Sequence, residues 1–246
     1  MMWEKTSAVM TPTGTAEDRA GASPLLDRLS PRDLARLTMG FYFAFWGTAL
    51  LLGAFCEMLT SLRPKVLDII MLGLGCAGLV MGAVRFHQVT GLGDSWRRRT
   101  REALIGASLL TYLCPFFLMW QRMSSNLYLL GHAIAFVAIF NYWLALSCQV
   151  ICQLGHASGK RSLVLQSILF GSITVLLLFP PFGRLALEMI VAARHGMDPV
   201  GLLQMWIARA SGWLVFALLL PFPLTLSLLW SAKDEALRRL LNVPEN

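Results

Sequence analysis

The chain has 246 residues, of which 56% are hydrophobic and only 14% are charged, and its formal net charge is +7. A soluble domain carries about 25% charged residues, so this shortage excludes a protein whose whole surface faces water. The mean hydropathy of +0.61 also indicates that much of the chain is apolar. The charges cluster and leave long uncharged runs between them, a pattern typical of a polytopic membrane protein.

The first 37 residues form a polar N-terminal tail with charges of both signs. The tail lacks the apolar core of a signal peptide, so we expect no cleavable leader here. Within it, the stretch Ser23–Leu37 places leucines at helical spacing between charges. This stretch is predicted either to lie on the membrane surface as a short amphipathic helix or to remain a solvated tail.

Six apolar runs follow, and a helix needs roughly 20 such residues to cross a hydrocarbon core of about 30 Å. The sequence therefore predicts an all-α fold with a six-helix transmembrane domain over residues 38–231. Residues 232–246 are expected to form a C-terminal helix or tail. The expected spans are Thr38–Thr60, Val66–Val84, Ala103–Trp120, Leu129–Leu154, Ser162–Phe179 and Ala210–Trp230.

The second run contains Gly73, Gly75 and Gly78 in the spacing of a dinucleotide-binding loop, G-x-G-x-x-G. Such a loop needs a preceding strand and a helix N-terminus that faces the pyrophosphate. Here the glycines lie inside an apolar run, where an irregular backbone would leave amides unpaired in hydrocarbon. In a helix, Gly73 with Ala77 and Gly78 with Gly82 form small-xxx-small pairs. These pairs predict the close approach of a neighbouring helix.

The Lys and Arg residues are divided unevenly between the two sides of the predicted membrane domain. Fifteen of the 21 fall on the side of the two termini and six on the other side. The positive-inside rule therefore predicts cytoplasmic N- and C-termini, and the short loops favour the inner (plasma) membrane as the location. The densest basic run, Ser95–Glu102, is explained by anionic lipid at that side. No recognition module accompanies this run, so we expect no nucleic-acid partner.

Polar side chains within a span are costly in lipid, which makes them the leading functional candidates. Asn141 lies near the middle of the fourth span. The helical period of 3.6 residues puts Ala138, Ala145, Cys148 and Cys152 on nearly the same face. This stripe is predicted to face other helices instead of lipid. Asn141 is expected to hydrogen-bond between helices, with contact to a substrate as the alternative.

No cluster of residues in the sequence indicates catalysis or metal binding. Cys148 and Cys152 are one helical turn apart and not at a redox C-x-x-C spacing, so we expect them to pack as small apolar side chains. His132 and His156 are about 36 Å apart along a helix, too far for two haems to exchange electrons well. We therefore expect no catalytic residue, no metal and no cofactor.

Prolines interrupt the last two spans. Pro180 and Pro181 are predicted to end the fifth span, while Pro221 and Pro223 remove two hydrogen-bond donors within the sixth. The sixth span is therefore expected to break, either as a plain kink or as part of a substrate path. The charged segment 183–209 between these sites predicts two short amphipathic helices on the outer side of the membrane. Their apolar faces are expected either to lie on the outer leaflet or to dock onto a partner.

The layout of six spans, a surface helix before the first and paired short helices before the last is similar to that of ABC-2-type export permeases. This resemblance implies a transport permease in which the loop Arg85–Glu102 contacts a cytoplasmic ATPase. The residues themselves favour a non-catalytic subunit of a larger membrane complex, in contact with lipid and with other membrane-protein subunits. A haem- or quinone-binding electron-transfer subunit is a third alternative.

Overall fold

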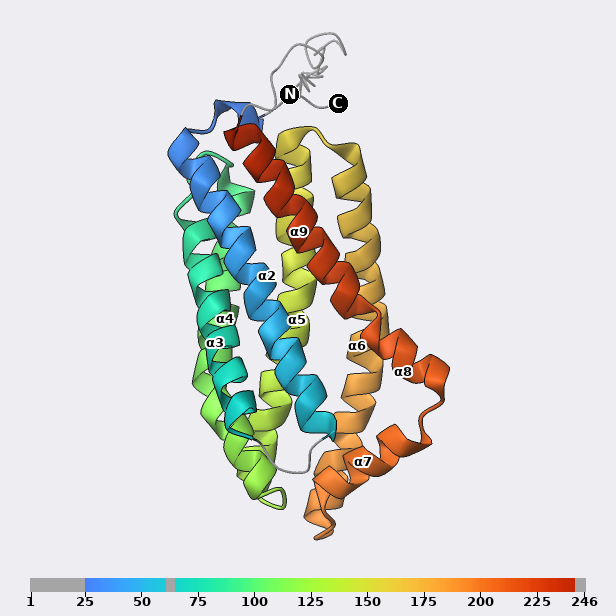
Figure 1. Cartoon of the computed structure of the whole chain (residues 1–246). Coiled ribbons are helices and arrows are strands. Elements are labelled where there is room, and N and C mark those ends of the chain that lie inside the picture. Colours follow the sequence, from blue (N-terminus) through green and yellow to red (C-terminus); the bar gives the residue numbers. More distant parts are fainter. Residues whose placement is uncertain (1–24, 61–64, 242–246) are drawn as a thin grey trace, which may run out of the picture.

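The computed structural model describes residues 25–60 and 65–241, and these residues form helices without any strand (Figure 1). Six helical segments in this part of the chain are long and apolar enough to cross a membrane, the last formed by two helices together. The all-α fold with six transmembrane segments is therefore confirmed. Its elements are η1 Leu25–Arg28, α2 Pro31–Thr60, α3 Val66–His87, α4 Asp94–Arg122, α5 Leu127–Ser158, α6 Arg161–Arg194, α7 Pro199–Arg209, α8 Gly212–Leu219 and α9 Pro221–Leu240.

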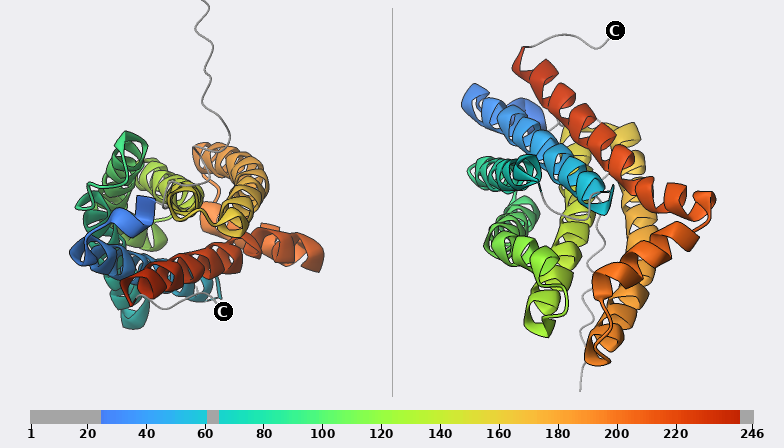
Figure 2. Two further views of the ribbon diagram at one scale, coloured as in Figure 1. Left: turned by 90° about the horizontal axis from the view of Figure 1, so that it is seen from above. Right: turned by 60° about the horizontal axis from the view of Figure 1, so that its bottom comes forward.

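Helix α5 occupies the middle of the bundle and contacts α4, α6 and α9. Viewed along the bundle, α4 and α6 flank α5, and α9 crosses the side of the bundle between α2 and α6 (Figure 2). Within the apolar window of α5, 61% of the residues are buried inside the chain, against 22% for α6 and 22% for the segment formed by α8 and α9. The last two segments therefore leave most of their surface for lipid or a partner.

Helix α2 contacts α3 through glycines on both helices. A Cβ atom added at Gly82 would lie 2.9 Å from the Gly40 carbonyl oxygen, and one at Gly47 would lie 2.9 Å from the Gly75 carbonyl oxygen. A Cβ atom at Gly78 would lie 3.0 Å from the Gly47 Cα. The two backbones can approach this closely only because these positions lack side chains, as in other small-residue interfaces between membrane helices.

The close contact uses only part of the predicted small-residue pairs. Gly78 and Gly82 face α2, whereas Gly73 and Ala77 are exposed, and a Cβ atom at Gly73 would meet no described atom within 4 Å. Positions three or four residues apart share one face of a helix. The contact therefore runs through Gly75, Gly78 and Gly82 instead of Gly73 and Ala77.

The fifth span does not end at its prolines. Helix α6 continues through Pro180 and Pro181 to Arg194, so the prediction of a helix end there is wrong. Each proline removes one donor from the helix, but Leu178 before them and Met189 after them are both buried and keep the two halves in line. Residues 183–194 are thus the last turns of α6, and α7 is a single short helix after them.

The sixth segment breaks at Leu220, immediately before Pro221 and Pro223. Helix α8 ends at Leu219, and α9 starts at Pro221 and runs in another direction (Figure 1). Because a proline nitrogen carries no hydrogen, the carbonyls of Ala217 and Leu219 lose the donors four residues ahead of them. The break therefore frees two backbone carbonyls at the end of α8.

The described residues nearest to the two termini pack on the bundle. In the described part of the tail, residues 25–28 form one 3₁₀ turn and residues 31–37 form the first turns of α2, where Leu26, Leu34 and Leu37 are buried. No separate surface helix forms in this described part, and residues 1–24 lie outside it. At the other end, α9 continues without a break to Leu240.

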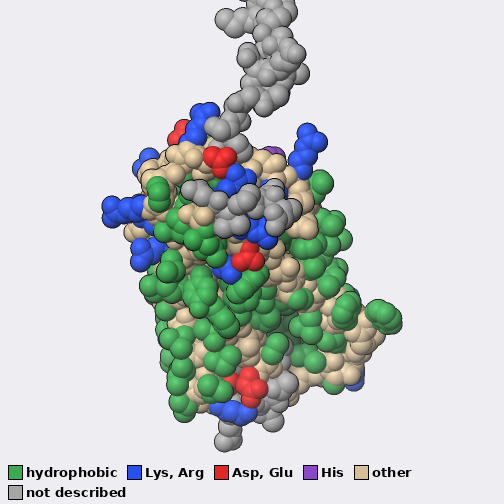
Figure 3. Space-filling view, turned by 45° about the horizontal axis from the view of Figure 1, so that its top comes forward, with side chains coloured by type: hydrophobic (Ala, Val, Ile, Leu, Met, Phe, Trp, Pro, Cys, Tyr) green, Lys and Arg blue, Asp and Glu red, His purple; other side chains and the backbone are tan. Residues whose placement is uncertain are grey.

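Basic side chains gather at the end of the bundle where α2 begins and α9 ends (Figure 3). We call this the basic end. The described residues that contribute are Arg28, Arg32, Arg36, Arg85, Arg97, Arg98, Arg99, Arg101, Lys160, Arg161, Lys233, Arg238 and Arg239. The opposite end carries fewer, among them Lys65, Arg122 and Arg194.

The glycine contact between α2 and α3 predicts different outcomes for two equivalent substitutions. Gly82→Ala forces the two backbones apart and is expected to cost about 1–3 kcal/mol of stability. Gly73→Ala introduces the same methyl group into open space and gains up to about 1 kcal/mol from helix propensity. Thermal unfolding of the purified protein in detergent measures both changes. Equal midpoints for the two variants would contradict the contact.

Candidate functional site

Asn141 lies on the buried face of α5, near the level of the break between α8 and α9. Its side chain is 5% exposed. The ring of the preceding residue, Phe140, lies 6.3 Å from the ring of Phe222, which stands between the two prolines of α9. Asn141 and the break, which the sequence could not relate to each other, are thus brought to the same part of the bundle.

Cys148 lies where α5, α6 and α9 meet. A Cβ atom at Gly171 of α6 would lie 3.2 Å from the Cys148 Cβ. The Cys148 thiol is also within hydrogen-bonding reach of Thr225 of α9. The Thr225 hydroxyl donates to the Pro221 carbonyl at 2.8 Å, which supports the first turn after the break. Cys152 lies one turn further along α5, and Cys148 and Cys152 both line a groove between α5 and α6.

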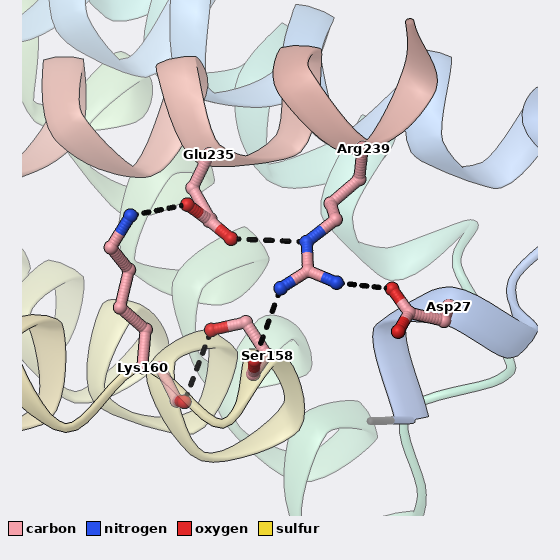
Figure 4. A network of polar contacts seen from close by, with 6 residues as sticks. Asp27, Ser158, Lys160, Glu235 and Arg239 are labelled. Atoms are coloured by element: carbon pink, nitrogen blue, oxygen red, sulfur yellow. Dashed lines mark hydrogen bonds and ion pairs between the residues drawn. The ribbon is translucent and has the colours of Figure 1, made fainter. Parts of the chain in front are cut away.

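A buried carboxylate joins three parts of the chain at the basic end (Figure 4). Glu235 of α9 is 4% exposed. It accepts hydrogen bonds from Lys160 Nζ at 2.8 Å and from Arg239 Nε at 3.2 Å. Arg239 also pairs with Asp27 of η1 and donates to the Ser158 carbonyl at 3.3 Å. We call Asp27, Lys160, Glu235 and Arg239 the terminal clamp.

The terminal clamp links η1, the turn between α5 and α6, and the end of α9. A buried carboxylate is costly unless cations and hydrogen bonds compensate its charge, and Lys160 and Arg239 supply both. The carboxylate of Glu235 is thus occupied by partners from its own chain. We therefore interpret the clamp as a structural element and not as a binding site.

A pocket of about 230 Å³ lies at the opposite end of the bundle, between α2, α4, α5, α6 and α7. We call it the aromatic pocket, because Phe55, Phe117, Trp120 and Phe182 form much of its wall. Its other lining residues are aliphatic or small, apart from two amide side chains described below, and none of its described lining residues is charged. An apolar pocket with a few polar groups is the usual form of a small-molecule site.

Contacts among aromatic rings hold the wall of the aromatic pocket in place. The Phe117 ring stacks on Phe136 at 4.9 Å between centroids. Phe55 of α2 contacts Phe117 at 5.4 Å and Phe140 at 5.3 Å. Offset or edge-on ring pairs of this kind add specific attraction to the burial of their area. Because these rings come from three helices, the wall depends on the bundle being assembled.

Helix α7 covers the aromatic pocket with Val200, Leu203 and Gln204. Its first turn is capped by Asp198, whose carboxylate accepts the backbone amides of Val200 and Gly201, both at 3.1 Å. The same carboxylate accepts the Ser124 hydroxyl, in the turn between α4 and α5, at 2.7 Å. Asp198 and Ser124 thus fasten α7 across the end of the bundle, and we call this pair the α7 latch.

The hydrogen bond from Ser124 is the main cause of a lowered pKa of Asp198. Partial burial of the carboxyl opposes this effect, and the amides of Val200 and Gly201 add to the lowering. Hydrogen bonds to the charged form of a carboxyl favour that form. The α7 latch is therefore strongest while Asp198 is ionised.

The sequence did not predict the aromatic pocket, although two residues near the apolar runs pointed to it. The sequence predicts that the apolar faces in segment 183–209 lie on the outer leaflet or dock onto a partner, whereas α7 turns part of its apolar face toward its own bundle. The signal lay in Gln121 and Gln204, two uncharged amides next to apolar runs, and both line the pocket. Within residues 25–60 and 65–241, no group of three or more His, Cys, Asp or Glu residues is arranged to hold a metal ion.

Comparison of the chain with protein-family models, with curated proteins and with solved structures finds no match. Its function must therefore be inferred from its own residues.

Loss of the buried carboxylate is predicted to loosen the terminal clamp. Glu235→Gln leaves two cations facing a neutral amide, and we expect a loss on the order of 2–3 kcal/mol. This is less than the 3–5 kcal/mol typical of a fully buried pair, because Lys160 and Arg239 are partly exposed. Glu188→Gln, in an exposed pair with Arg184, should cost less than about 1 kcal/mol. Thermal unfolding compares the two variants, and equal losses would contradict the clamp.

The α7 latch predicts a stability difference that depends on pH. Since the folded pKa of Asp198 is lowered, its contribution is fully present above the unfolded pKa of about 3.9. It is lost as the pH falls through the lower folded pKa. Ser124→Ala removes the main cause of the shift, so wild type should melt higher than this variant at pH 7, and the gap should close as the pH falls below the folded pKa of Asp198. A gap that stays constant with pH would exclude the latch.

Proposed function

We propose that this chain is a non-catalytic subunit of a larger complex in the inner (plasma) membrane, and that α8 is the element that contacts the partner. The observation that carries this proposal is the position of α8, which projects sideways from the bundle (Figure 2). None of the eight described residues of α8 is buried. Trp213 is 83% exposed and Phe216 is 58% exposed.

The backbone of α8 favours a protein partner over lipid. The carbonyls of Ala217 and Leu219 have lost their helical donors to Pro221 and Pro223. Lipid chains offer no donor, and an unsatisfied backbone group in hydrocarbon costs several kcal/mol. A transmembrane helix that carries a hydroxyl or amide side chain at this depth would supply the missing hydrogen bonds. We therefore assign the face of α8 to such a helix.

The distribution of charge supports an orientation with both termini in the cytoplasm. The basic end carries most of the described Lys and Arg residues, and anionic lipids of the inner leaflet attract such a surface. Arg97 and Arg101 at the start of α4 are exposed there. Arg98 and Arg99 instead pair with Glu102. This end would lie at the inner leaflet in the proposed complex.

Transport and electron transfer stay predictions. The proximity of Asn141 to the break in α9, seen in the contact between Phe140 and Phe222, is compatible with a permease. The basic run that the permease layout assigned to a loop begins α4 as regular helix, so an ATPase would meet a helix start there. We favour the complex subunit because α8 leaves the bundle and none of its described residues is buried.

A photoreactive side chain at Trp213 is expected to cross-link to one defined membrane protein in native membranes. The matched control is the same group at Tyr112 of α4, which is 61% exposed and should give lipid adducts only. The double change Trp213→Ala and Phe216→Ala should lower recovery of the cross-linked partner about tenfold, the effect of roughly 1.4 kcal/mol. Lipid adducts alone at both positions, or a native mass equal to one chain, would refute the proposal.

A further inference from the structure

The size of the aromatic pocket sets the size of what it can hold. Its volume is about 230 Å³, and an apolar cavity of about 150 Å³ is known to bind benzene. The aromatic pocket therefore takes one substituted ring, with any longer tail left outside. Its ring-lined wall, with Phe117 stacked on Phe136, favours a flat ring over an acyl chain, because aromatic faces pair with one another in offset stacks.

The polar groups in the wall limit the chemistry of that ring. Trp120 is 5% exposed, and its indole N–H, within the described residues, has no hydrogen-bond partner. A buried donor without a partner is unfavourable, so a turn of the indole toward an acceptor on the ligand would stabilise the site. Gln121 and Gln204 line the same pocket and can each donate or accept. Since none of the described lining residues is charged, an ionised ligand would lack compensation.

We propose that the aromatic pocket binds the ring of a neutral, membrane-soluble compound that carries a ring carbonyl, such as an alkylated benzoquinone. The carbonyl accepts hydrogen bonds from the donors of Trp120 and Gln204, and the ring lies against the phenylalanine wall. Helix α7 covers the bound ring, fastened by the α7 latch. This site is separate from the face of α8, so the proposal does not depend on the partner proposed above.

The test is saturable binding of a decyl-substituted benzoquinone to the full chain in detergent, measured as a shift in thermal midpoint with concentration. Decylbenzene, which has the ring and the tail but no carbonyl, is the matched ligand control and should bind at least tenfold more weakly. Phosphatidylglycerol tests the other source of a carbonyl acceptor, the ester of a lipid. It should not displace the benzoquinone.

Two variants test the assigned donors. Trp120→Phe keeps a ring in the wall and removes the N–H, and Gln204→Leu removes an amide with little change in volume. Each should weaken benzoquinone binding about fivefold to tenfold. Gln149→Leu, at an exposed position on α5, should leave binding unchanged. Melting without ligand shows whether each variant is folded, and Gln121→Leu replaces any that is not.

Three results would overturn the proposal. The first is equal binding of decylbenzene and the benzoquinone, which would mean that the carbonyl is not recognised. The second is displacement of the benzoquinone by phosphatidylglycerol, which would make the pocket a lipid site. The third is unchanged binding in the folded variants at Trp120 and Gln204. None of these results bears on cross-linking at α8, so the failure of one proposal is distinguishable from the failure of the other.

Discussion

Hydrocarbon offers no hydrogen-bond partners, and this constraint governs the whole structure. Every backbone amide and carbonyl at membrane depth must be satisfied by the chain itself or by a neighbour, which leaves helices as the natural spanning element. Helices α4 and α6 continue through Pro115 and through Pro180 and Pro181, although each of these prolines removes one donor. The sixth segment instead breaks at Leu220, before Pro221 and Pro223. This break is also the point where α8 leaves the bundle.

Without a strong hydrophobic drive between helices in lipid, the bundle depends on close packing and on a few polar contacts. The glycine contact between α2 and α3 supplies close packing, since Gly82 and Gly47 let the two backbones touch. The terminal clamp supplies the polar contacts, at the basic end, where α2 begins and α9 ends. Helix α6 and the segment formed by α8 and α9 remain the least buried of the six, at 22% of the residues in the apolar window of each.

The sequence predicts the six spans well because the ability of a segment to cross a bilayer depends on its own length and composition. The sequence predicts less well which face of a helix packs on its neighbour. On α3 the contact uses Gly75 and not Gly73, and the two glycines can be told apart only once the position of α2 is known. The sequence wrongly predicts a helix end at Pro180 and Pro181. Helix α6 continues past them because Leu178 and Met189 are buried in the assembled bundle, and this burial cannot be read from the local sequence. The aromatic pocket could not be predicted, since its walls come from five helices.

Helix α7, which covers the aromatic pocket, and α8, whose face is exposed, follow one another in the chain. Helix α7 is held to the bundle by the α7 latch and by its apolar face, and α8 follows after only two residues, Ala210 and Ser211. The prolines turn α8 away from the bundle at Leu220. The α7 latch and the contacts of Val200 and Leu203 with the pocket keep α7 over the end of the bundle. The cover over the pocket and the exposed face of α8 therefore have separate causes, although the two helices adjoin in the chain.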